Sequence, residues 1–462
     1  MNGAAAARRT EATEPEPEVV VVRTARRLRG ELTLPGDKSI SHRALMLAAL
    51  AEGESRISGA GDGADVRSTA GIIAALGAAV ERVAGDERNA DYRVVSLGAD
   101  GLRQPAGVLD CGNSGTSLRL FAGLLAGLPM TATLDGDESL RGRPVARIIE
   151  PLRSMGAELH ARHDDSLPPV TVVGHSPLRA VDVEPRVPSA QVKSAILLAG
   201  LRADGETSVR EAVATRDHTE RMLRARGIGV RTARSDRGVT VTVEGGGRVQ
   251  AVEERVPGDV SAAAFWLVGA AIHPDAELTL RGVGVNPTRR AVIDLLRAMG
   301  AEIDERPLGD GAGDAPNDGV GEPVADLTVR SSRLRAIDLG PADVAAAIDE
   351  IPILCLAAAG AEGTTRIRGA GELRHKESDR IAGIAAGLTA LGVRVAVDGD
   401  DLAIHGGARL TGASTDSLDD HRLAMTFAIA GLLASGDTLI RRPASASVSY
   451  PGFFAELERV RS

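Results

Sequence analysis

The chain has 462 residues, of which 43% are hydrophobic and only 2% aromatic, and its formal net charge at pH 7 is -9. This length is enough to bury a large core and predicts two domains. The negative charge argues against a general nucleic-acid-binding surface, because such surfaces are usually basic. No apolar run reaches the roughly 20 residues that cross a bilayer, so we expect no membrane contact.

The start of the chain and its cysteines predict a cytoplasmic protein. Residues 1–18 include Arg8 and Arg9 but no apolar stretch, and they end in alternating glutamate and proline, so we expect a disordered tail rather than a signal peptide. Cys111 and Cys355 lie in apolar sequence without the spacing of metal ligands. We therefore expect two buried free thiols, with neither a disulfide nor a metal site.

Beyond the tail, one pattern occurs six times. Each unit opens with a short polar motif, continues into an apolar run of helix length, turns, and then shows a short strand followed by an amphipathic helix. Apolar runs include 44–50, 196–201, 262–272 and 423–434, and strands are expected at 55–58, 131–134, 277–280 and 438–440. The opening motifs are Asp37-Lys38-Ser39, residues 112–116, 188–191, Pro257-Gly258-Asp259, residues 349–352 and 419–422.

The second helix of five units is expected to end at a glycine. A glycine just past a helix end supplies a left-handed cap, and the apolar residue after it begins the next strand. The longest interval between these glycines contains residues 307–321, rich in Gly, Asp and Pro, which we expect to form a surface loop. The five glycines are Gly77, Gly156, Gly227, Gly300 and Gly392.

The six units predict two α/β globules of three units each. A helix that is apolar on every side belongs in an interior, so the first helix of each unit should be buried beneath the strands and the second helix. We predict one domain from residues 36–256 and another from residues 19–35 together with 257–462, with a strand at 19–33. The chain should cross between them near Pro35-Gly36 and Pro257-Gly258.

The polar opening motifs precede the buried helices, so they place unpaired amides and positive helix ends at one end of each domain. If the two domains face each other, these ends form a cleft that attracts anions. Many of the motif residues are also explained as helix N-caps, and for Asp259 that is a sufficient explanation.

Lysine is rare in this chain, which has 51 arginines and three lysines, Lys38, Lys193 and Lys376. A lysine that is retained against such a bias indicates a place that needs a compact ammonium to bind phosphate or exchange a proton. We expect this of Lys38 and Lys376, because other motif residues surround them. For Lys193 the composition bias is an equally good explanation.

Eight motifs resemble those of 5-enolpyruvylshikimate-3-phosphate (EPSP) synthases over about residues 20–460. They are Leu34–Arg43, Gly112–Thr116, Arg141–Pro144, Ser189–Gln191, Thr215–Thr219, Asp349–Pro352, Lys376–Arg380 and Asp420–Arg422. Eight matches in family order and at family-like spacing are a specific signal. The resemblance implies a two-domain inside-out α/β barrel, each domain holding three βαβαββ repeats whose buried helices direct their N-termini at an interdomain cleft.

The resemblance also implies an activity. Such enzymes transfer the enolpyruvyl group of phosphoenolpyruvate to the 5-hydroxyl of shikimate 3-phosphate and release phosphate, on the route to chorismate and the aromatic amino acids. We therefore expect a monomeric transferase without a cofactor, and these two small molecules as its partners. Arginine forks match phosphate and carboxylate groups in two-point geometry, which explains the need for several of them.

The resemblance assigns residues to each substrate. Asp349, together with Lys38, would take the proton of the 5-hydroxyl, and Glu377 would protonate the methylene carbon of phosphoenolpyruvate. The acid role of Glu377 requires burial that raises its pKa. Implied at phosphoenolpyruvate are Lys38, Gly115, Arg143, Gln191, Arg380 and Arg422; implied at shikimate 3-phosphate are Lys38, Ser39, Arg43, Ser189, Ala190, Gln191, Arg216, Asp349 and Lys376.

The chain departs from many members of the family at a few positions. It has Ala190 in place of a serine, Glu372 in place of an asparagine, and Val448-Ser449 where a lysine precedes the last Phe-Pro pair. The late lysine contact to phosphoenolpyruvate is therefore in question. A side chain at the position of Gly115 hinders the herbicide glyphosate in some relatives, so its absence here predicts sensitivity.

Three alternatives remain open from the sequence. The related transferase that acts on UDP-N-acetylglucosamine has Lys-Asn in place of Lys38-Ser39 and typically a cysteine in the loop that matches residues 135–142, which here contains none. An RNA 3'-phosphate cyclase-like enzyme would use a C-terminal histidine, for which His421 is a formal candidate, but the negative charge and the few aromatic residues count against it. The predicted catalytic carboxylates count against a non-catalytic repeat scaffold.

Overall fold

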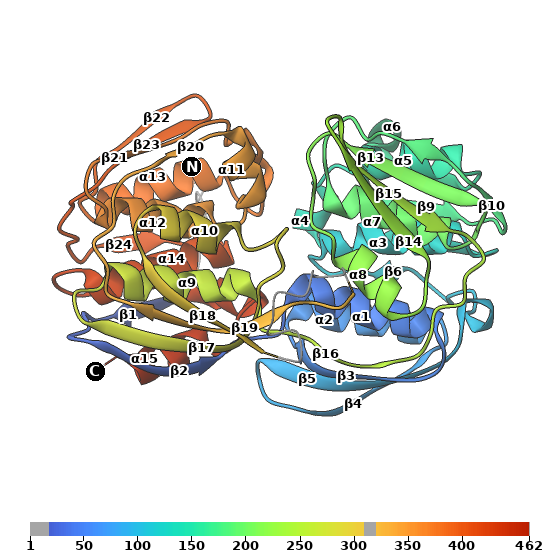
Figure 1. Cartoon of the computed structure of the whole chain (residues 1–462), viewed down its shortest axis with the longest axis horizontal. Coiled ribbons are helices and arrows are strands. Elements are labelled where there is room, and N and C mark those ends of the chain that lie inside the picture. The colour runs from blue at the N-terminus through green and yellow to red at the C-terminus, as the bar shows by residue number, and fades with distance from the viewer. Residues whose placement is uncertain (1–17, 309–319, 462) are drawn as a thin grey trace, which may run out of the picture.

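Five four-stranded sheets, one three-stranded sheet and one two-stranded sheet, with helices between them, form two lobes that lie side by side (Figure 1). This computed structural model describes residues 18–308 and 320–461, so nearly all of the expected tail and most of the expected loop at 307–321 lie outside the described residues. Within these ranges, no helix has the length and apolarity to cross a membrane. The chain is a mixed α/β protein, as its sequence predicts.

Buried apolar residues form two separate cores, one in each lobe. The core of lobe I comes from 22–34 and 260–460, and the core of lobe II comes from 40–256. These ranges match the two domains that we inferred from the sequence. The division of the chain into those two domains is our proposal, and the separate cores support it.

Lobe II contains three units of alternating strands and helices. The first is α1 (Lys38–Leu50), β3 (Glu52–Gly61), α2 (Ala64–Ala75), β4 (Ala79–Gly85), β5 (Asn89–Leu97) and η1 (Ala99–Gly101). The second is β6 (Leu109–Asp110), α3 (Gly115–Ala126), β7 (Thr131–Asp135), α4 (Glu138–Arg141), α5 (Ala146–Ser154), β8 (Glu158–Ala161), α6 (Arg162–Asp165) and β9 (Leu167–Val173). The third is β10 (Leu178–Arg179), β11 (Asp182–Val183), α7 (Ala190–Gly200), β12 (Ala203–Asp204), β13 (Glu206–Glu211), α8 (His218–Ala225), β14 (Val230–Ser235) and β15 (Gly238–Glu244), followed by β16 (Glu253–Arg255).

Lobe I repeats this organisation. It begins with β1 (Val19–Val22) and β2 (Leu28–Thr33) and resumes with α9 (Val260–Ile272), β17 (Ala276–Gly284), α10 (Ala291–Ala298), β18 (Glu302–Leu308) and β19 (Val324–Arg330). The next unit is β20 (Asp338–Leu339), α11 (Pro341–Ala346), α12 (Ile351–Gly360), β21 (Thr364–Ile367), η2 (Gly371–His375), α13 (Arg380–Ala390), β22 (Val395–Asp398) and β23 (Asp401–His405). The last is β24 (Ser414–Asp416), α14 (His421–Leu433), β25 (Thr438–Arg441), η3 (Pro443–Val448) and α15 (Phe453–Val460).

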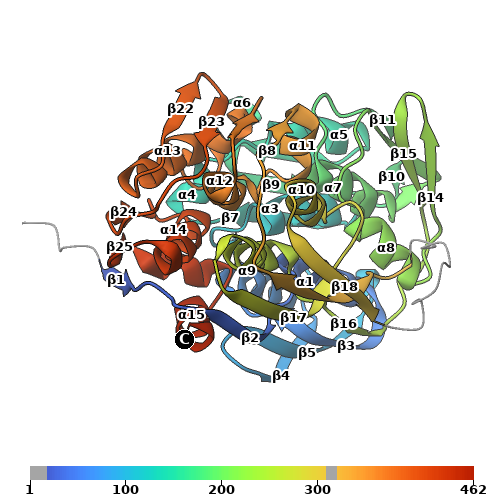
Figure 2. The same ribbon diagram turned by 60° about the vertical axis from the view of Figure 1, so that its left-hand side comes forward.

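The four-stranded sheets share one strand order. In the sheet β6-β7-β9-β8, the strand before the first helix runs parallel to the strand after it, and a hairpin adds two antiparallel strands. The sheets β11-β13-β15-β14 and β20-β21-β23-β22 repeat this order. The first helices are almost completely buried, and α9, α12 and α14 pack against one another inside lobe I (Figure 2). The predicted strand-and-helix pattern thus recurs in the five four-stranded sheets, whereas the last unit has the three-stranded sheet β1-β25-β24.

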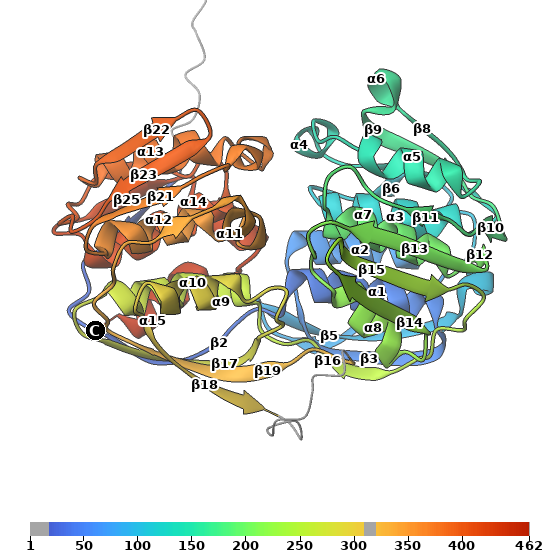
Figure 3. The same cartoon turned by 45° about the horizontal axis from the view of Figure 1, so that its top comes forward.

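The two lobes exchange one strand each. β2 precedes α1 in the chain but pairs with β17 in lobe I, whereas β16 precedes α9 but pairs with β3 in lobe II. At the crossings, the Asp37 N–H donates to the Pro257 carbonyl over 2.8 Å, and the Asp259 N–H donates to the Pro35 carbonyl over 2.9 Å. A Cβ on Gly36 would lie 2.0 Å from the carbonyl oxygen of Gly59, so this crossing requires glycine. Two hydrogen-bonded segments thus connect the lobes along one edge (Figure 3).

Two local expectations from the sequence can now be compared with the structure. The strand expected at 19–33 is wrong, because it is two strands: β1 pairs with β25 and β2 pairs with β17. Between them the Ala25 N–H donates to the Leu432 carbonyl, which turns the chain toward the end of α14. The expected left-handed glycine caps are confirmed, with φ from +78° to +104° at Gly77, Gly156, Gly227, Gly300 and Gly392. Both cysteines are buried and free, as expected.

Close packing between buried helices yields a stability prediction. A Cβ on Gly123 of α3 would lie 2.2 Å from the carbonyl oxygen of Ala195 in α7. We expect Gly123→Ala to lower the free energy of unfolding by about 1–3 kcal/mol, because the methyl group must push the helices apart. Gly71 of α2 is exposed and has no atom within 4 Å of its Cβ position, so Gly71→Ala should raise that free energy by about 0.5–1 kcal/mol. Urea unfolding measures both, and equal shifts would contradict the contact.

Candidate active site

Charged side chains from both lobes meet where the first helices begin. Arg143 of lobe II lies 3.8 Å from Glu377 of lobe I, and Arg216 of lobe II lies 2.9 Å from Asp349 of lobe I. These contacts join parts of the chain that are more than 130 residues apart. We call the following group the interlobe charge cluster: Lys38, Arg143, Arg216, Asp349, Lys376, Glu377, Arg380 and Arg422.

Lys38 is the first residue of α1. Asp37 caps this helix, since its Oδ1 accepts the Ile40 N–H over 2.9 Å. The Lys38 ammonium lies 3.0 Å from Asp65 Oδ2, and its side chain is 29% exposed. Burial lowers the pKa of Lys38, but the charges of Asp65 and Glu377 outweigh burial and raise it above its usual value. Lys38 is therefore a protonated donor in this structure.

Residues expected at shikimate 3-phosphate lie around the starts of α1 and α7. Arg43 is one turn beyond Ser39, and its Nη1 donates to the Ser39 carbonyl over 2.8 Å, so the two share a face of α1. Arg43 itself is 4% exposed, with Nε and Nη2 donating to Thr219 and Ser194 inside lobe II. Burial lowers its pKa to about 10. The structure therefore gives Arg43 protein partners for all three of these donor nitrogens.

The start of α7 carries three more expected residues. Ser189 is its N-cap, with Oγ accepting from the Val192 N–H over 3.4 Å, and Ala190 is the first helical residue. Gln191 follows, and its Nε2 donates to Thr116 Oγ1 over 3.0 Å. This contact connects the start of α7 to the start of α3, where Gly115 lies.

Asp349 is the carboxylate with the most cationic neighbours. It lies just before α12, and its Oδ2 accepts from Arg216 Nη2 over 2.9 Å. Its Oδ1 lies 3.6 Å from the Lys376 ammonium and 3.7 Å from Arg380 Nη1. Burial would raise the pKa of Asp349, but the charges of Lys376 and Arg216 hold it well below its usual range. Asp349 is thus ionised and can accept a proton.

Glu377 has the opposite environment from the one an acid needs. Its Oε2 accepts from Arg380 Nη2 over 2.5 Å. Burial raises the pKa of Glu377, but the charges of Arg380, His421, Arg143 and Lys38 lower it far below its usual value. We expected burial to raise the pKa, and this expectation is wrong for the structure, because the surrounding positive charge outweighs the desolvation.

The remaining arginines are held by carboxylates or polar groups. Arg380 is 1% exposed, and its Nε donates to Asp420 Oδ2 over 2.8 Å. Arg422 donates to Ser261 Oγ and lies 3.7 Å from Glu350 Oε1. A ligand anion that reaches these guanidinium groups must therefore displace protein oxygen atoms.

Arg143 and Gly115 lie together in lobe II. Arg143 Nη2 donates to Asn113 Oδ1 over 2.5 Å, and Gly115 is the first residue of α3. A Cβ on Gly115 would lie 3.7 Å from Arg143 Nη1 and 2.7 Å from Arg119 Nη1. A side chain at residue 115 would therefore press on the guanidinium of Arg119 and contact that of Arg143, which is expected to bind phosphoenolpyruvate.

Sequence reasoning missed several residues that contact the predicted site residues. Asp65 pairs with Lys38, but none of the motifs quoted from the sequence includes it. Arg119, one turn after Gly115, donates to Gln191 Oε1 over 2.8 Å. Asp420 was grouped in a motif but given no role, although it holds Arg380. The repeat of polar residues at helix starts was the signal that could have found Asp420, whereas Asp65 depends on the packing of α2 against α1.

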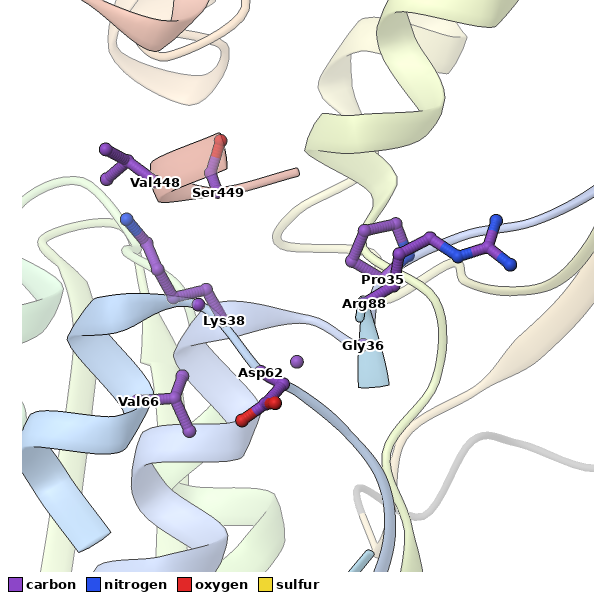
Figure 4. A pocket seen from close by; sticks show the side chains of 10 residues that line it. Pro35, Gly36, Lys38, Asp62, Val66, Arg88, Val448 and Ser449 are labelled. Carbon is purple, nitrogen blue, oxygen red and sulfur yellow. The ribbon is translucent and has the colours of Figure 1, made fainter. Parts of the chain in front are cut away.

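The segment that lacks the family's late lysine lines a small pocket beside Lys38. Figure 4 shows Val448 and Ser449 opposite Lys38, with Gly36 near the crossing. The pocket has a volume of about 10 Å³, which is room for about one water molecule. The position without lysine therefore lies next to the charge cluster.

Comparison with known sequences gives a family match over nearly the whole chain. A sequence model of the family described as EPSP synthase (3-phosphoshikimate 1-carboxyvinyltransferase) matches residues 22–457. A 3-phosphoshikimate 1-carboxyvinyltransferase of Gloeobacter violaceus is 52% identical over 438 residues, which cover 95% of this chain and 98% of the relative. The protein of that name from Bacillus thuringiensis is 45% identical over 433 residues, covering 94% and 97%.

Solved structures show the same arrangement. An EPSP synthase from Acinetobacter baumannii superposes with a TM-score of 0.84 at 39% identity, covering 96% of this chain and 98% of the other. The enolpyruvyl transferase NikO from Streptomyces tendae superposes with a TM-score of 0.76 at 20% identity over 96% and 98%. At that identity the second match shows a shared fold alone.

A buried histidine beside the cluster predicts a pH dependence of stability. His42, four residues after Lys38, is fully buried, and its Nδ1 lies 2.7 Å from Thr69 Oγ1. Burial lowers its pKa to about 3, against an unfolded value of about 6.5. The unfolded chain therefore binds a proton that the folded chain does not, so this stabilisation is present above pH 6.5 and is lost as the pH falls toward 3.

In the parent, the free energy of unfolding should fall as the pH is lowered from 6 to 4.5, because of His42. We expect this fall to be less steep in His42→Asn, by about 1.4 kcal/mol per pH unit. Asparagine keeps an acceptor near the position of Nδ1. The measurement is urea unfolding of parent and variant at several pH values. Burial and the charge of Asp37 raise the pKa of Asp259 to about 6, so this group makes the free energy of unfolding rise as the pH falls. The slope of the parent alone is therefore not decisive, and the difference between parent and variant is the quantity to compare. Identical slopes would show that His42 is already protonated when folded.

Proposed function

The chain belongs to the EPSP synthase family, and we propose that its interlobe charge cluster performs the family's reaction. As a 3-phosphoshikimate 1-carboxyvinyltransferase, it transfers the enolpyruvyl group of phosphoenolpyruvate to shikimate 3-phosphate within aromatic amino-acid biosynthesis. The proposal concerns which side chains bind the two substrates and which move protons.

One observation supports the proposal above the others: cationic side chains of both lobes surround two carboxylates at ion-pair distances. Arg216 and Arg143 come from lobe II, whereas Asp349, Glu377 and Lys376 come from lobe I. Two phosphates and a carboxylate need such a concentration of donors. Substrate anions would replace Asp349 and Glu377 as partners of these cations.

We assign phosphoenolpyruvate to the side of the cluster around Arg143, Arg380 and Arg422, with Lys38, Gly115 and Gln191 beside it. We assign shikimate 3-phosphate to the side around Arg216 and Lys376, with Ser39, Ser189 and Ala190 at the helix starts. In both cases the positive helix ends add to the side-chain charges. Arg43 would act here by holding the Ser39 backbone, since its own donors face lobe II.

The reaction then proceeds by addition and elimination. Asp349, assisted by Lys38, takes the 5-hydroxyl proton as that oxygen bonds to C2 of phosphoenolpyruvate, and Glu377 donates a proton to C3. In the tetrahedral adduct, C3 returns its proton to Glu377 as the bond from C2 to the phosphate oxygen breaks, and the phosphate leaves with the proton that Asp349 took. No oxidant or metal is needed for this balance.

Substrate binding also supplies the pKa change that Glu377 requires. Arg143 and Arg380 lower the pKa of Glu377 in this structure. Anionic groups of phosphoenolpyruvate at these arginines would offset their charge, so the pKa of Glu377 would rise toward the range of a proton donor. The acid is thus activated by the substrate that it protonates.

We further propose the two-domain inside-out α/β barrel for the fold, with the helix starts of both domains facing each other. The repeated strand order and the buried first helices support it. We propose a monomer, because one chain contributes every residue assigned above. The cytoplasmic location stays a prediction from the sequence.

The proton-transfer proposal is tested by Glu377→Gln. We expect turnover to fall by about 10²–10⁴-fold, because the amide cannot donate the proton, while binding of shikimate 3-phosphate stays within about twofold. Phosphate release measures turnover, and titration calorimetry measures binding. The parent should release phosphate with shikimate 3-phosphate but not with UDP-N-acetylglucosamine in its place. Retained turnover in Glu377→Gln would remove the acid role from this residue.

Gly115 gives a second test. We expect the parent enzyme to be inhibited by glyphosate and Gly115→Ala to need about tenfold more of it, because the methyl group must displace the guanidinium of Arg119 and also contacts that of Arg143. The KM for phosphoenolpyruvate should rise in the same variant. Gly71→Ala, at a helix position open to solvent, is the matched control and should change neither value. A parent enzyme that is unaffected by millimolar glyphosate would refute the prediction.

A further inference from the structure

The third lysine lies at the centre of a buried charge cluster in lobe II. Lys193 of α7 is 2% exposed, and its ammonium lies 2.9 Å from Glu211 Oε2 and 2.8 Å from Glu220 Oε1. Both glutamates are also buried, with 3% and 1% exposed. Glu211 ends β13 and Glu220 lies in α8, so the three residues join three elements of one unit.

This cluster holds the turn that carries Arg216. Lys193 Nζ donates to the Thr215 carbonyl over 3.3 Å. Glu211 accepts both the Thr215 N–H, over 3.3 Å, and the Thr215 hydroxyl. The backbone and side chain of Thr215 are therefore fixed by two buried charged groups immediately before Arg216.

From this turn the chain reaches across to lobe I. Arg216 Nη2 donates to Asp349 Oδ2 over 2.9 Å, and the Asp217 N–H donates to Thr288 Oγ1 over 3.1 Å. His218 Nδ1 lies 2.8 Å from Glu322 Oε1. Three consecutive residues thus contact the other lobe, and the turn at Thr215 fixes where they begin.

The arrangement also explains why this residue is lysine in a chain with 51 arginines. Three oxygens surround the ammonium, from Glu211, Glu220 and the Thr215 backbone. An ammonium can direct its three N–H groups at three separate oxygens, whereas a guanidinium is planar and longer. Arg43 adds another positive charge beside this buried group of Lys193, Glu211 and Glu220, since it donates to Ser194 and Thr219.

We propose that Lys193 is a positioning residue for shikimate 3-phosphate: by fixing the Thr215 turn, it aims the guanidinium of Arg216 into the interlobe charge cluster. This role rests on the proposed function of that cluster. Burial lowers the pKa of Lys193, and the charges of Glu220 and Glu211 raise it above its usual value, so the ammonium stays charged. Lys193 itself is too deeply buried to touch a substrate.

The test combines Lys193→Met with Arg216→Met in a double-mutant cycle. We expect Lys193→Met to raise the KM for shikimate 3-phosphate about tenfold, with the KM for phosphoenolpyruvate changed by less than about twofold, because the displaced group faces one substrate. In the Arg216→Met background, Lys193→Met should cause no further rise, since its effect passes through Arg216. Arg231→Met, at an exposed ion pair of the same lobe, is the control and should change neither KM.

Thermal unfolding checks that each variant is folded. If Lys193→Met does not fold, Thr215→Val takes its place, since it keeps the shape of the side chain and removes only the hydroxyl contact to Glu211. It should raise the same KM by a smaller factor. An unchanged KM for shikimate 3-phosphate, or a rise that persists in full without Arg216, would overturn the proposal. A parent enzyme that does not turn over shikimate 3-phosphate would instead refute the proposed function.

Discussion

The structure depends on the exchange of β2 and β16 between the lobes. In each lobe, one sheet contains a strand that is followed along the chain by a helix of the other lobe. The two segments that cross between the lobes hydrogen-bond to each other. The lobes therefore cannot separate without removing a strand from a sheet. Because α1 and α9 start directly at these crossings, the helix starts of both lobes are held toward a common region.

The charge cluster follows from that constraint. Positive helix ends and arginines gathered in one region would repel one another, and burial would add a desolvation cost. Carboxylates of the protein offset both: Asp65 faces Lys38, Asp349 faces Arg216, and Asp420 holds Arg380. The gathered cations also explain the strongly lowered pKa of Glu377, since Arg380, Arg143 and Lys38 outweigh the effect of its burial. A site for anionic substrates is thus stable only because it contains carboxylates that those substrates can displace.

The sequence could predict the repeats, because an apolar helix with a polar start leaves a strong and regular pattern. It could also predict the residues at those starts, since Lys38, Gly115, Ala190 and His421 each begin a buried helix. It could not predict contacts that depend on packing between elements, such as Asp65 with Lys38. The direction of the pKa shift at Glu377 could not be predicted for the same reason. It depends on whether the surrounding cations outweigh the effect of burial, and the number of those cations is set by packing.

Lysine usage shows how far one sequence signal can be taken. Lys38 and Lys376 are 29% and 23% exposed and each faces one carboxylate, at 3.0 Å from Asp65 and 3.6 Å from Asp349, so an anion can still reach their ammonium groups. Lys193 is 2% exposed and already surrounded by three oxygens. The rarity of lysine indicated an ammonium site at Lys38 and Lys376 and left Lys193 open. In the structure, the number of oxygens around each ammonium separates the two groups that a ligand can reach from the one that holds the backbone. For Lys193 the composition bias therefore no longer suffices, because its surroundings match an ammonium better than the guanidinium used elsewhere in the chain.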